Sequence, residues 1–156
     1  MIVSDATALI TLINIDEFQV LSLFAEQLIV TPEVYAEVTQ QAHAKKYMDT
    51  QQENGFIFIQ SYVDSSRFDA FCYLLDAGES ASITLALEKN LPLIIDEKKG
   101  RKFAQAQGVE IIGLVGILRY LYVEDVLTKE EIQDIIQKLN ASDFRISPAL
   151  LALVLK

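Results

Sequence analysis

The sequence has very little cysteine, histidine or tryptophan. Among 156 residues there is one cysteine, Cys72, one histidine, His43, and no tryptophan. A single cysteine cannot form a disulfide within the chain, and one thiol with one imidazole cannot supply the ligands of a structural zinc site. Disulfide scaffolds, zinc fingers and haem ligation are therefore excluded.

Long apolar runs and basic residues are also scarce. No stretch approaches the roughly 18 uninterrupted apolar residues that a membrane helix needs, and the opening MIVSD lacks the basic residues of a secretory signal. We therefore expect a cytoplasmic protein with no membrane segment. The 13 Lys and Arg residues are outnumbered by 22 Asp and Glu, giving a net charge of −9. This balance argues against nonspecific coating of DNA but permits a local basic patch.

Apolar residues, in contrast, make up 51% of the chain, enough for one domain with a substantial core. Short apolar runs alternate with segments of helical periodicity. We expect strands at 1–4, 56–59, 91–95 and 109–112, and helices that include 6–15, 31–44, 69–75, 81–88, 98–107 and 114–122. This alternation predicts an α/β fold, a three-layer α/β/α sandwich with a mainly parallel central sheet. Residues 1–156 are expected to form one domain, with 124–156 as a helical C-terminal extension.

Two acids directly follow expected strands. Asp5 comes after residues 1–4, and Asp96 comes after the apolar run that ends at Ile95. Because ligands of a parallel sheet gather at the carboxyl ends of its strands, we expect both carboxylates in one crevice. The alternative is that each acid caps the helix that follows it.

Two further acids are predicted to lie on the inner faces of helices. Glu37 shares a helix face with Val34 and Val38, although it also fits a carboxylate at the edge of that apolar stripe. Glu79 begins the inner face of the helix that continues over 81–88. Its spacing from Asp76 is also that of a capping box, and the two roles are compatible.

Four carboxylates in one crevice would repel one another unless a cation lay between them. Ligation by oxygen alone favours Mg²⁺ or Mn²⁺ over zinc. Such an ion lowers the pKa of bound water and neutralises charge that develops on a phosphodiester. Asp5, Glu37, Glu79 and Asp96 together therefore indicate the chemistry of a metal-dependent nuclease.

Four segments, in this order, resemble the PIN domain family. They are Val3-Ser4-Asp5-Ala6-Thr7-Ala8-Leu9, Thr31-Pro32-Glu33-Val34-Tyr35-Ala36-Glu37-Val38, Asp76-Ala77-Gly78-Glu79-Ser80-Ala81 and Ile94-Ile95-Asp96-Glu97. More narrowly, the chain is similar to small PIN-like prokaryotic proteins grouped with the toxins of toxin–antitoxin pairs. That branch has a D-x-G-E-x-x-A segment and a D-E pair after the fourth strand. The likeness extends from Met1 to about Leu118, and residues 144–148 look like the tail of that branch.

The resemblance implies a Mg²⁺- or Mn²⁺-dependent endoribonuclease, the toxin of a toxin–antitoxin pair. The family's acids match Asp5, Glu37, Glu79 and Asp96, and Thr7 matches the small hydroxyl residue after the first acid. The same resemblance implies an RNA substrate, a homodimer and a small antitoxin protein that covers the acidic pocket. The chain departs from the family after Asp96, where many members carry another acid a few residues on. Here either Glu97 is the substitute or the site holds only one metal firmly.

A basic cluster follows Asp96 directly. Lys98, Lys99, Arg101 and Lys102 are four of the 13 basic residues, and a phosphate backbone could dock on them. The alternative is a solvated helix start, although cations at the amino end of a helix oppose its dipole.

Two other functions compete with that of a nuclease. A catalytically silent PIN-like module that binds nucleic acid or protein would keep the fold, and a metal titration with an RNA cleavage assay separates the two. A phosphoacceptor receiver or an aspartate-nucleophile phosphatase fits worse, because Asp5-Ala6-Thr7 lacks the second acid of a D-x-D motif and Glu79 would be unexplained.

Association is expected from composition. A mean hydropathy of +0.27 is high for a monomer with so small a surface. The stripes expected to stay exposed lie around Leu118, Leu121 and Tyr122 and in the tail 149–155. The alternative is that the tail packs against its own domain.

Overall fold

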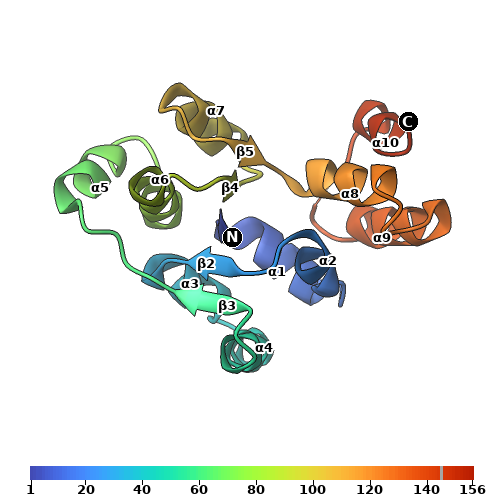
Figure 1. Ribbon diagram of the computed structural model, residues 1–156, viewed down its shortest axis with the longest axis horizontal. Helices are drawn as coiled ribbons and strands as arrows, with labels where there is room; N and C mark the ends of the chain where they lie inside the picture. The colour runs from blue at the N-terminus through green and yellow to red at the C-terminus, as the bar shows by residue number, and fades with distance from the viewer. Residues whose placement is uncertain (145) are drawn as a thin grey trace.

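The computed structural model describes residues 1–144 and 146–156 (Figure 1). Its strands form one five-stranded sheet in the order β3-β2-β1-β4-β5, with every neighbouring pair parallel. The strands are β1 (Ile2–Ser4), β2 (Leu28–Val30), β3 (Ile57–Ile59), β4 (Leu93–Ile94) and β5 (Ile111–Ile112). The predicted α/β fold with a parallel sheet is confirmed.

Helices connect and cover these strands. They are α1 (Ala6–Asn14), α2 (Gln19–Phe24), α3 (Pro32–Val38), α4 (Ala42–Glu53), α5 (Ser65–Phe71), α6 (Ala77–Lys89), α7 (Lys98–Ala106), α8 (Leu114–Val123), α9 (Lys129–Ala141) and α10 (Pro148–Val154). None of them, over the described residues, has both the length and the apolar character to cross a membrane.

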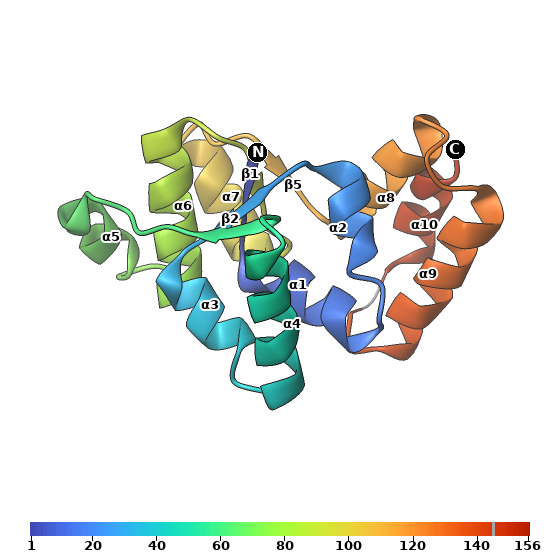
Figure 2. The ribbon, with the colours of Figure 1, turned by 60° about the horizontal axis from the view of Figure 1, so that its bottom comes forward.

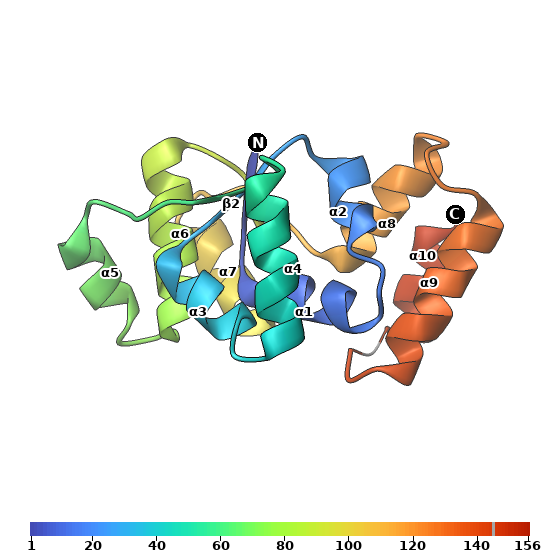
Figure 3. The same cartoon turned by 90° about the horizontal axis from the view of Figure 1, so that it is seen from below.

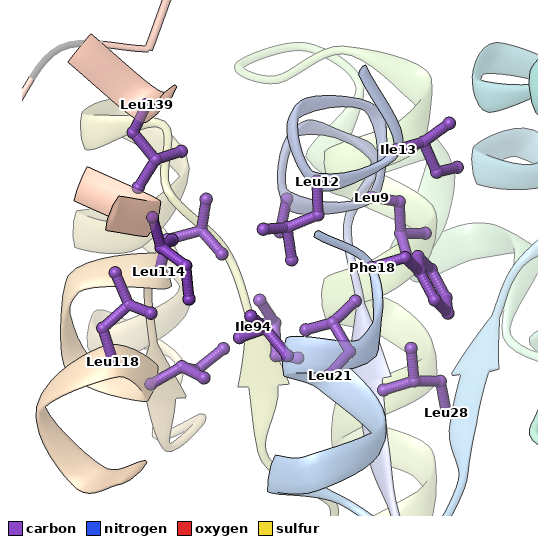
Figure 4. Packing of buried hydrophobic residues seen from close by; sticks show 14 of the residues in the cluster. Leu9, Leu12, Ile13, Phe18, Leu21, Leu28, Ile94, Leu114, Leu118 and Leu139 are labelled. Carbon is purple, nitrogen blue, oxygen red and sulfur yellow. The ribbon is translucent and has the colours of Figure 1, made fainter. Parts of the chain in front are cut away.

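Alternating strand residues divide the interior into two cores. Ile2, Leu28 and Ile94 face a larger core shared with helices that include α1, α2, α8 and α9 (Figure 4). Val3 and Ile29 face a smaller core shared with α5, α6 and α7. Because successive side chains of a strand point to opposite faces, the two cores lie on opposite sides of the sheet. The result is the predicted three-layer α/β/α sandwich.

The strand order places a switch point between β1 and β4. From β1 the chain builds outward through β2 to β3, then returns to add β4 and β5 on the other side. In open α/β sheets, the crevice at such a point, at the carboxyl ends of the strands, is the usual ligand site. Asp5 and Asp96 follow these two strands.

Several helix boundaries differ from the sequence prediction. The helix expected over 31–44 is two helices, because α3 ends where the Thr39 hydroxyl donates to the Tyr35 carbonyl at 2.6 Å and Gln41 then begins α4. The helix expected over 69–75 forms earlier, as α5, because Asp64 caps it by accepting the Arg67 N–H. The apolar periodicity of the sequence did not predict α2.

One of the two stripes expected to be exposed is mostly buried. Leu118 and Leu121 are 1% and 0% exposed, because α8 packs into the larger core and α10 packs against α8. Figures 2 and 3 show α8, α9 and α10 together at one end of the molecule, opposite α5. Leu150 and Leu153 of α10 remain exposed. The expectation of an exposed stripe was therefore wrong for Leu118 and Leu121.

Candidate functional site

Asp5 is a buried carboxylate that helix capping does not explain. Its N–H donates to the Ile94 carbonyl of β4 at 2.9 Å, which fixes its place at the switch point. The residue is 5% exposed and occupies the N-cap position of α1, yet its side chain makes no capping hydrogen bond. The predicted alternative of a simple cap is therefore unsupported for Asp5.

Asp96 has a structural partner on another helix. Both of its carboxylate oxygens accept the Leu114 N–H at the start of α8, each at 3.2 Å. Burial raises the pKa of Asp96, while this N–H and the nearby Arg101 guanidinium act in the opposite direction. Asp96 therefore caps α8, a helix far along the chain, instead of the helix that follows it.

Glu37 reaches the same crevice from α3, which packs against both α1 and α6. Its carboxylate lies beside Gly78: a Cβ placed on that glycine would be 3.0 Å from Glu37 Oε1. The same point is 3.6 Å from Asp5 Oδ1 and 3.6 Å from Asp76 Oδ1. The absence of a side chain at residue 78 thus leaves open a small volume bordered by three carboxylates.

Both roles predicted for Glu79 are seen at the start of α6: it takes part in the capping box, and its side chain is buried. Asp76 accepts the Glu79 N–H at 2.8 Å, and Glu79 Oε1 accepts the Asp76 N–H at 3.4 Å. Glu79 is 7% exposed, and its Oε2 is buried with no hydrogen-bond donor among the residues that the structure describes. The carboxyl of Glu97 lies beside that of Glu79. Two neighbouring carboxyls can share only a proton or a cation.

The pKa shifts reflect this crowding. Burial, with repulsion from Asp76 and Glu37, raises the pKa of Asp5 to about 7. Burial and the contact with Glu97 raise the pKa of Glu79 to about 8. Burial and the charge of Asp76 raise the pKa of Glu37. These carboxyls therefore hold protons more tightly than free acids, and a cation would relieve the same repulsion.

The donors suit a hard divalent cation. All are carboxylate oxygens, one of them is buried without a donor, and Gly78 leaves space between three others. Over residues 1–144 and 146–156, however, no three Asp, Glu, His or Cys side chains already stand in metal-binding geometry. The candidate ligands lie near one another, and their carboxylate side chains would have to rotate to coordinate an ion together.

The sequence pattern did not assign Asp76 to the site. Its spacing predicted only a cap, because a capping box by itself gives no sign of what lies across the helix terminus. The sequence feature that could have placed Asp76 in the site is Gly78. A glycine two residues after a capping residue leaves room for carboxylates of neighbouring helices to approach. Glu97, the candidate substitute acid, accepts the Gly100 N–H at 2.7 Å as the cap of α7 and also faces Glu79.

The predicted nucleic-acid-binding residues take different positions. Lys98, Lys99 and Lys102 are exposed on α7. Arg101 is half-buried and donates from Nη1 to the Ile95 carbonyl at 2.7 Å. Thr7 is half-buried in the first turn of α1.

The class defined by the fold is a parallel α/β/α sandwich with acids gathered at its switch point. The chain belongs to the PIN domain family, because a family model described as a PIN domain matches residues 1–156. This match confirms the resemblance found in the sequence. PIN domains generally use divalent metals, and the assignment indicates nucleic-acid binding. No curated protein matches the chain.

Proposed function

We propose that this protein is a metal-dependent endoribonuclease that hydrolyses RNA phosphodiester bonds. The catalytic and metal-binding residues in this proposal are Asp5, Glu37, Glu79 and Asp96, and the metal is Mg²⁺ or Mn²⁺. The observation that carries it is the grouping of Asp5, Glu37 and Asp76 around Gly78, beside a buried Glu79 oxygen that has no hydrogen-bond donor among the described residues.

Each residue has a distinct part in the proposed chemistry. Asp5 and Asp96, fixed by backbone hydrogen bonds at the ends of β1 and β4, would hold the ion with Glu37 and Glu79. A bound divalent ion supplies a water of lowered pKa and neutralises charge on the phosphodiester. The raised pKa of Glu79 belongs to the metal-free protein, so an ion that binds there would displace the proton that this carboxyl otherwise holds.

The exposed lysines of α7 extend this proposal to the substrate. Lys98, Lys99 and Lys102 lie on the helix that follows Asp96, where they would contact RNA phosphates. The role of toxin in a toxin–antitoxin pair, with a homodimer and an antitoxin over the acids, is supported by the sequence motifs of the branch.

A cleavage assay tests the proposal. Labelled RNA is incubated with the wild type in Mn²⁺, in Mg²⁺ and in EDTA, and in parallel with Asp5→Asn, Glu79→Gln and the control Glu26→Gln, an exposed acid remote from the site. Metal-dependent cleavage by the wild type and Glu26→Gln alone is the expected result. RNA binding without cleavage under every condition would instead favour the catalytically silent module.

A further inference from the structure

A second feature of the molecule is a cavity of about 600 Å³ beside Asp96. Its lining includes Asp96 and Arg101, Ile112 and Gly113 of the β5–α8 turn, and two residues of the C-terminal segment, Phe144 and Leu150. Figure 1 shows β5 between α7 and α8, with α10 beside α8. Small-molecule sites have volumes of about 300–1,000 Å³, so the cavity has the size of a ligand pocket.

The charged groups in the lining of this cavity are the Arg101 guanidinium and the Asp96 carboxylate. Arg101 donates one N–H to the Ile95 carbonyl, and its guanidinium has further donors to offer. Its charge opposes the rise of the Asp96 pKa, but within the described part of the chain no carboxylate forms a direct ion pair with it. On a protein of net charge −9, the remaining donors of this half-buried arginine provide a specific place for an anion.

Two glycines shape the cavity. A Cβ on Gly113 would overlap Asp96 Oδ1 and come within 2.8 Å of Arg101 Nη1. A Cβ on Gly116 would lie 2.8 Å from Ile112 Cγ1, another group of the lining. Glycine at these positions lets the charged groups approach the turn and lets α8 lie close to β5, so the cavity is built into the backbone.

The lining also has an apolar and aromatic part. Phe144 is half-buried against the larger core, and Leu150 is 43% exposed on α10. An aromatic ring in the lining of a cavity offers a stacking face to a planar base, and such stacking tolerates every base. The cavity thus brings an arginine and an aromatic side chain into one lining.

We propose that this cavity binds one nucleotide of a single-stranded RNA, with its phosphate on Arg101 and its base against Phe144. The inference rests on the proposed function, since it places this nucleotide next to the bond that the acids would hydrolyse. The match is one of chemistry, because a nucleotide is anionic at one end and flat and apolar at the other. A partner peptide is the competing occupant, but it has no equal need of a cation beside the acids.

Binding to RNA tests this assignment. A fluorescent single-stranded RNA of about eight nucleotides, with phosphorothioate linkages that slow hydrolysis, is titrated with each protein in Mn²⁺ and followed by anisotropy. The variants are Phe144→Leu, which keeps apolar packing but loses stacking, Phe144→Trp, which keeps stacking, and Arg101→Gln. Tyr73→Leu, at an aromatic side chain 90% exposed beyond α5, and Lys46→Gln, at an exposed lysine of α4, are the matched controls. An RNA with 5-iodouridine is crosslinked in parallel and the attached peptide identified.

The expected result is an affinity about tenfold weaker for Phe144→Leu and Arg101→Gln, near-wild-type affinity for Phe144→Trp and Tyr73→Leu, and a crosslink at Phe144. Wild-type affinity for Phe144→Leu and Arg101→Gln, with crosslinks elsewhere, would overturn the proposal and leave a peptide as the occupant. Cleavage by these variants at the wild-type rate and KM would show that the nuclease function stands without the pocket. Binding of RNA by the wild type without cleavage would overturn the function alone, and the same variants would still decide the pocket.

Discussion

Asp96 accepts the backbone N–H of Leu114 through both carboxylate oxygens, each at 3.2 Å, and so joins the end of β4 to the start of α8. This bond gives Asp96 a structural role besides the proposed metal ligation. The two roles are separable by substitution, because an amide keeps an acceptor oxygen and a methyl group does not.

We therefore expect Asp96→Asn to remain folded with little loss of stability, and Asp96→Ala to lower the free energy of unfolding by about 1 kcal/mol, as for a lost helix cap. Urea denaturation in EDTA measures both. Equal stability of the two variants would contradict the capping role. Both variants should lose metal-dependent cleavage.

Asp5 should behave differently from Asp96. Because its buried carboxylate makes no capping bond and is repelled by its neighbours, Asp5→Asn should be at least as stable as the wild type without metal. The wild type should gain about 2.7 kcal/mol at a metal concentration of 100 times Kd, and Asp5→Asn should gain much less. Thermal denaturation with and without Mn²⁺ provides the comparison, with Glu26→Gln as control. An Asp5→Asn protein that unfolds would instead make Asp5 a structural residue.

Gly78→Ala is a second substitution that distinguishes an effect on stability from an effect on metal binding. Alanine favours a helix over glycine by about 1 kcal/mol, and the closest contact of its Cβ would be the end of the flexible Glu37 side chain, at 3.0 Å. The metal-free variant should therefore be as stable as the wild type or more stable. Its methyl group would occupy the space between Asp5, Glu37 and Asp76, so calorimetry should show weakened Mn²⁺ binding. Undiminished Mn²⁺ affinity would place the ion away from Gly78.

Stability without metal should fall as pH rises. The folded-state pKa values of Asp5, about 7, and Glu79, about 8, exceed the ordinary values of 3.8 and 4.5. Between the ordinary and the raised values the folded protein holds protons that the unfolded chain has released, so the free energy of unfolding decreases with pH. The melting temperature in EDTA should be higher near pH 6 than near pH 8, and Mn²⁺ should raise it more at the higher pH because the ion competes with protons. An Asp5→Asn protein with the wild-type pH profile would contradict this explanation.

The lysines of α7 should contribute to RNA affinity through charge. Changing Lys98, Lys99 and Lys102 to Ala should weaken RNA binding and flatten its dependence on salt, by up to about 0.7 in the logarithmic slope for each phosphate that the variant no longer neutralises. Sequence preference should change little, since groups that bind phosphates do not read bases. A salt slope identical to that of the wild type would make these lysines a solvated surface.

Much of this arrangement could be predicted from the sequence because its signals are local. Apolar runs located β1 and β4, and in a parallel sheet their carboxyl ends share an edge, so Asp5 and Asp96 could be placed together. The D-x-x-E spacing likewise predicted the capping box of Asp76 and Glu79.

What could not be predicted depends on contacts between distant segments. The bond from Leu114 to Asp96 spans 18 residues, and the approach of Glu37 to Gly78 depends on how α3 packs on α6. The same holds for Leu118 and Leu121, whose apolar stripe is equally compatible with a subunit interface and with burial in the domain. Helical periodicity reveals an apolar face but not what covers it.

A crystal structure grown with Mn²⁺ tests the central claim most directly, because anomalous scattering locates the ion independently of any activity. We expect a peak at the switch point between β1 and β4, with carboxylate oxygens of Asp5 and at least two of Glu37, Glu79 and Asp96 about 2.1–2.2 Å from the ion or joined to it through a bound water. A fully occupied ion elsewhere on the protein, or these four carboxylates left without an ion at a Mn²⁺ concentration that supports cleavage, would contradict the account.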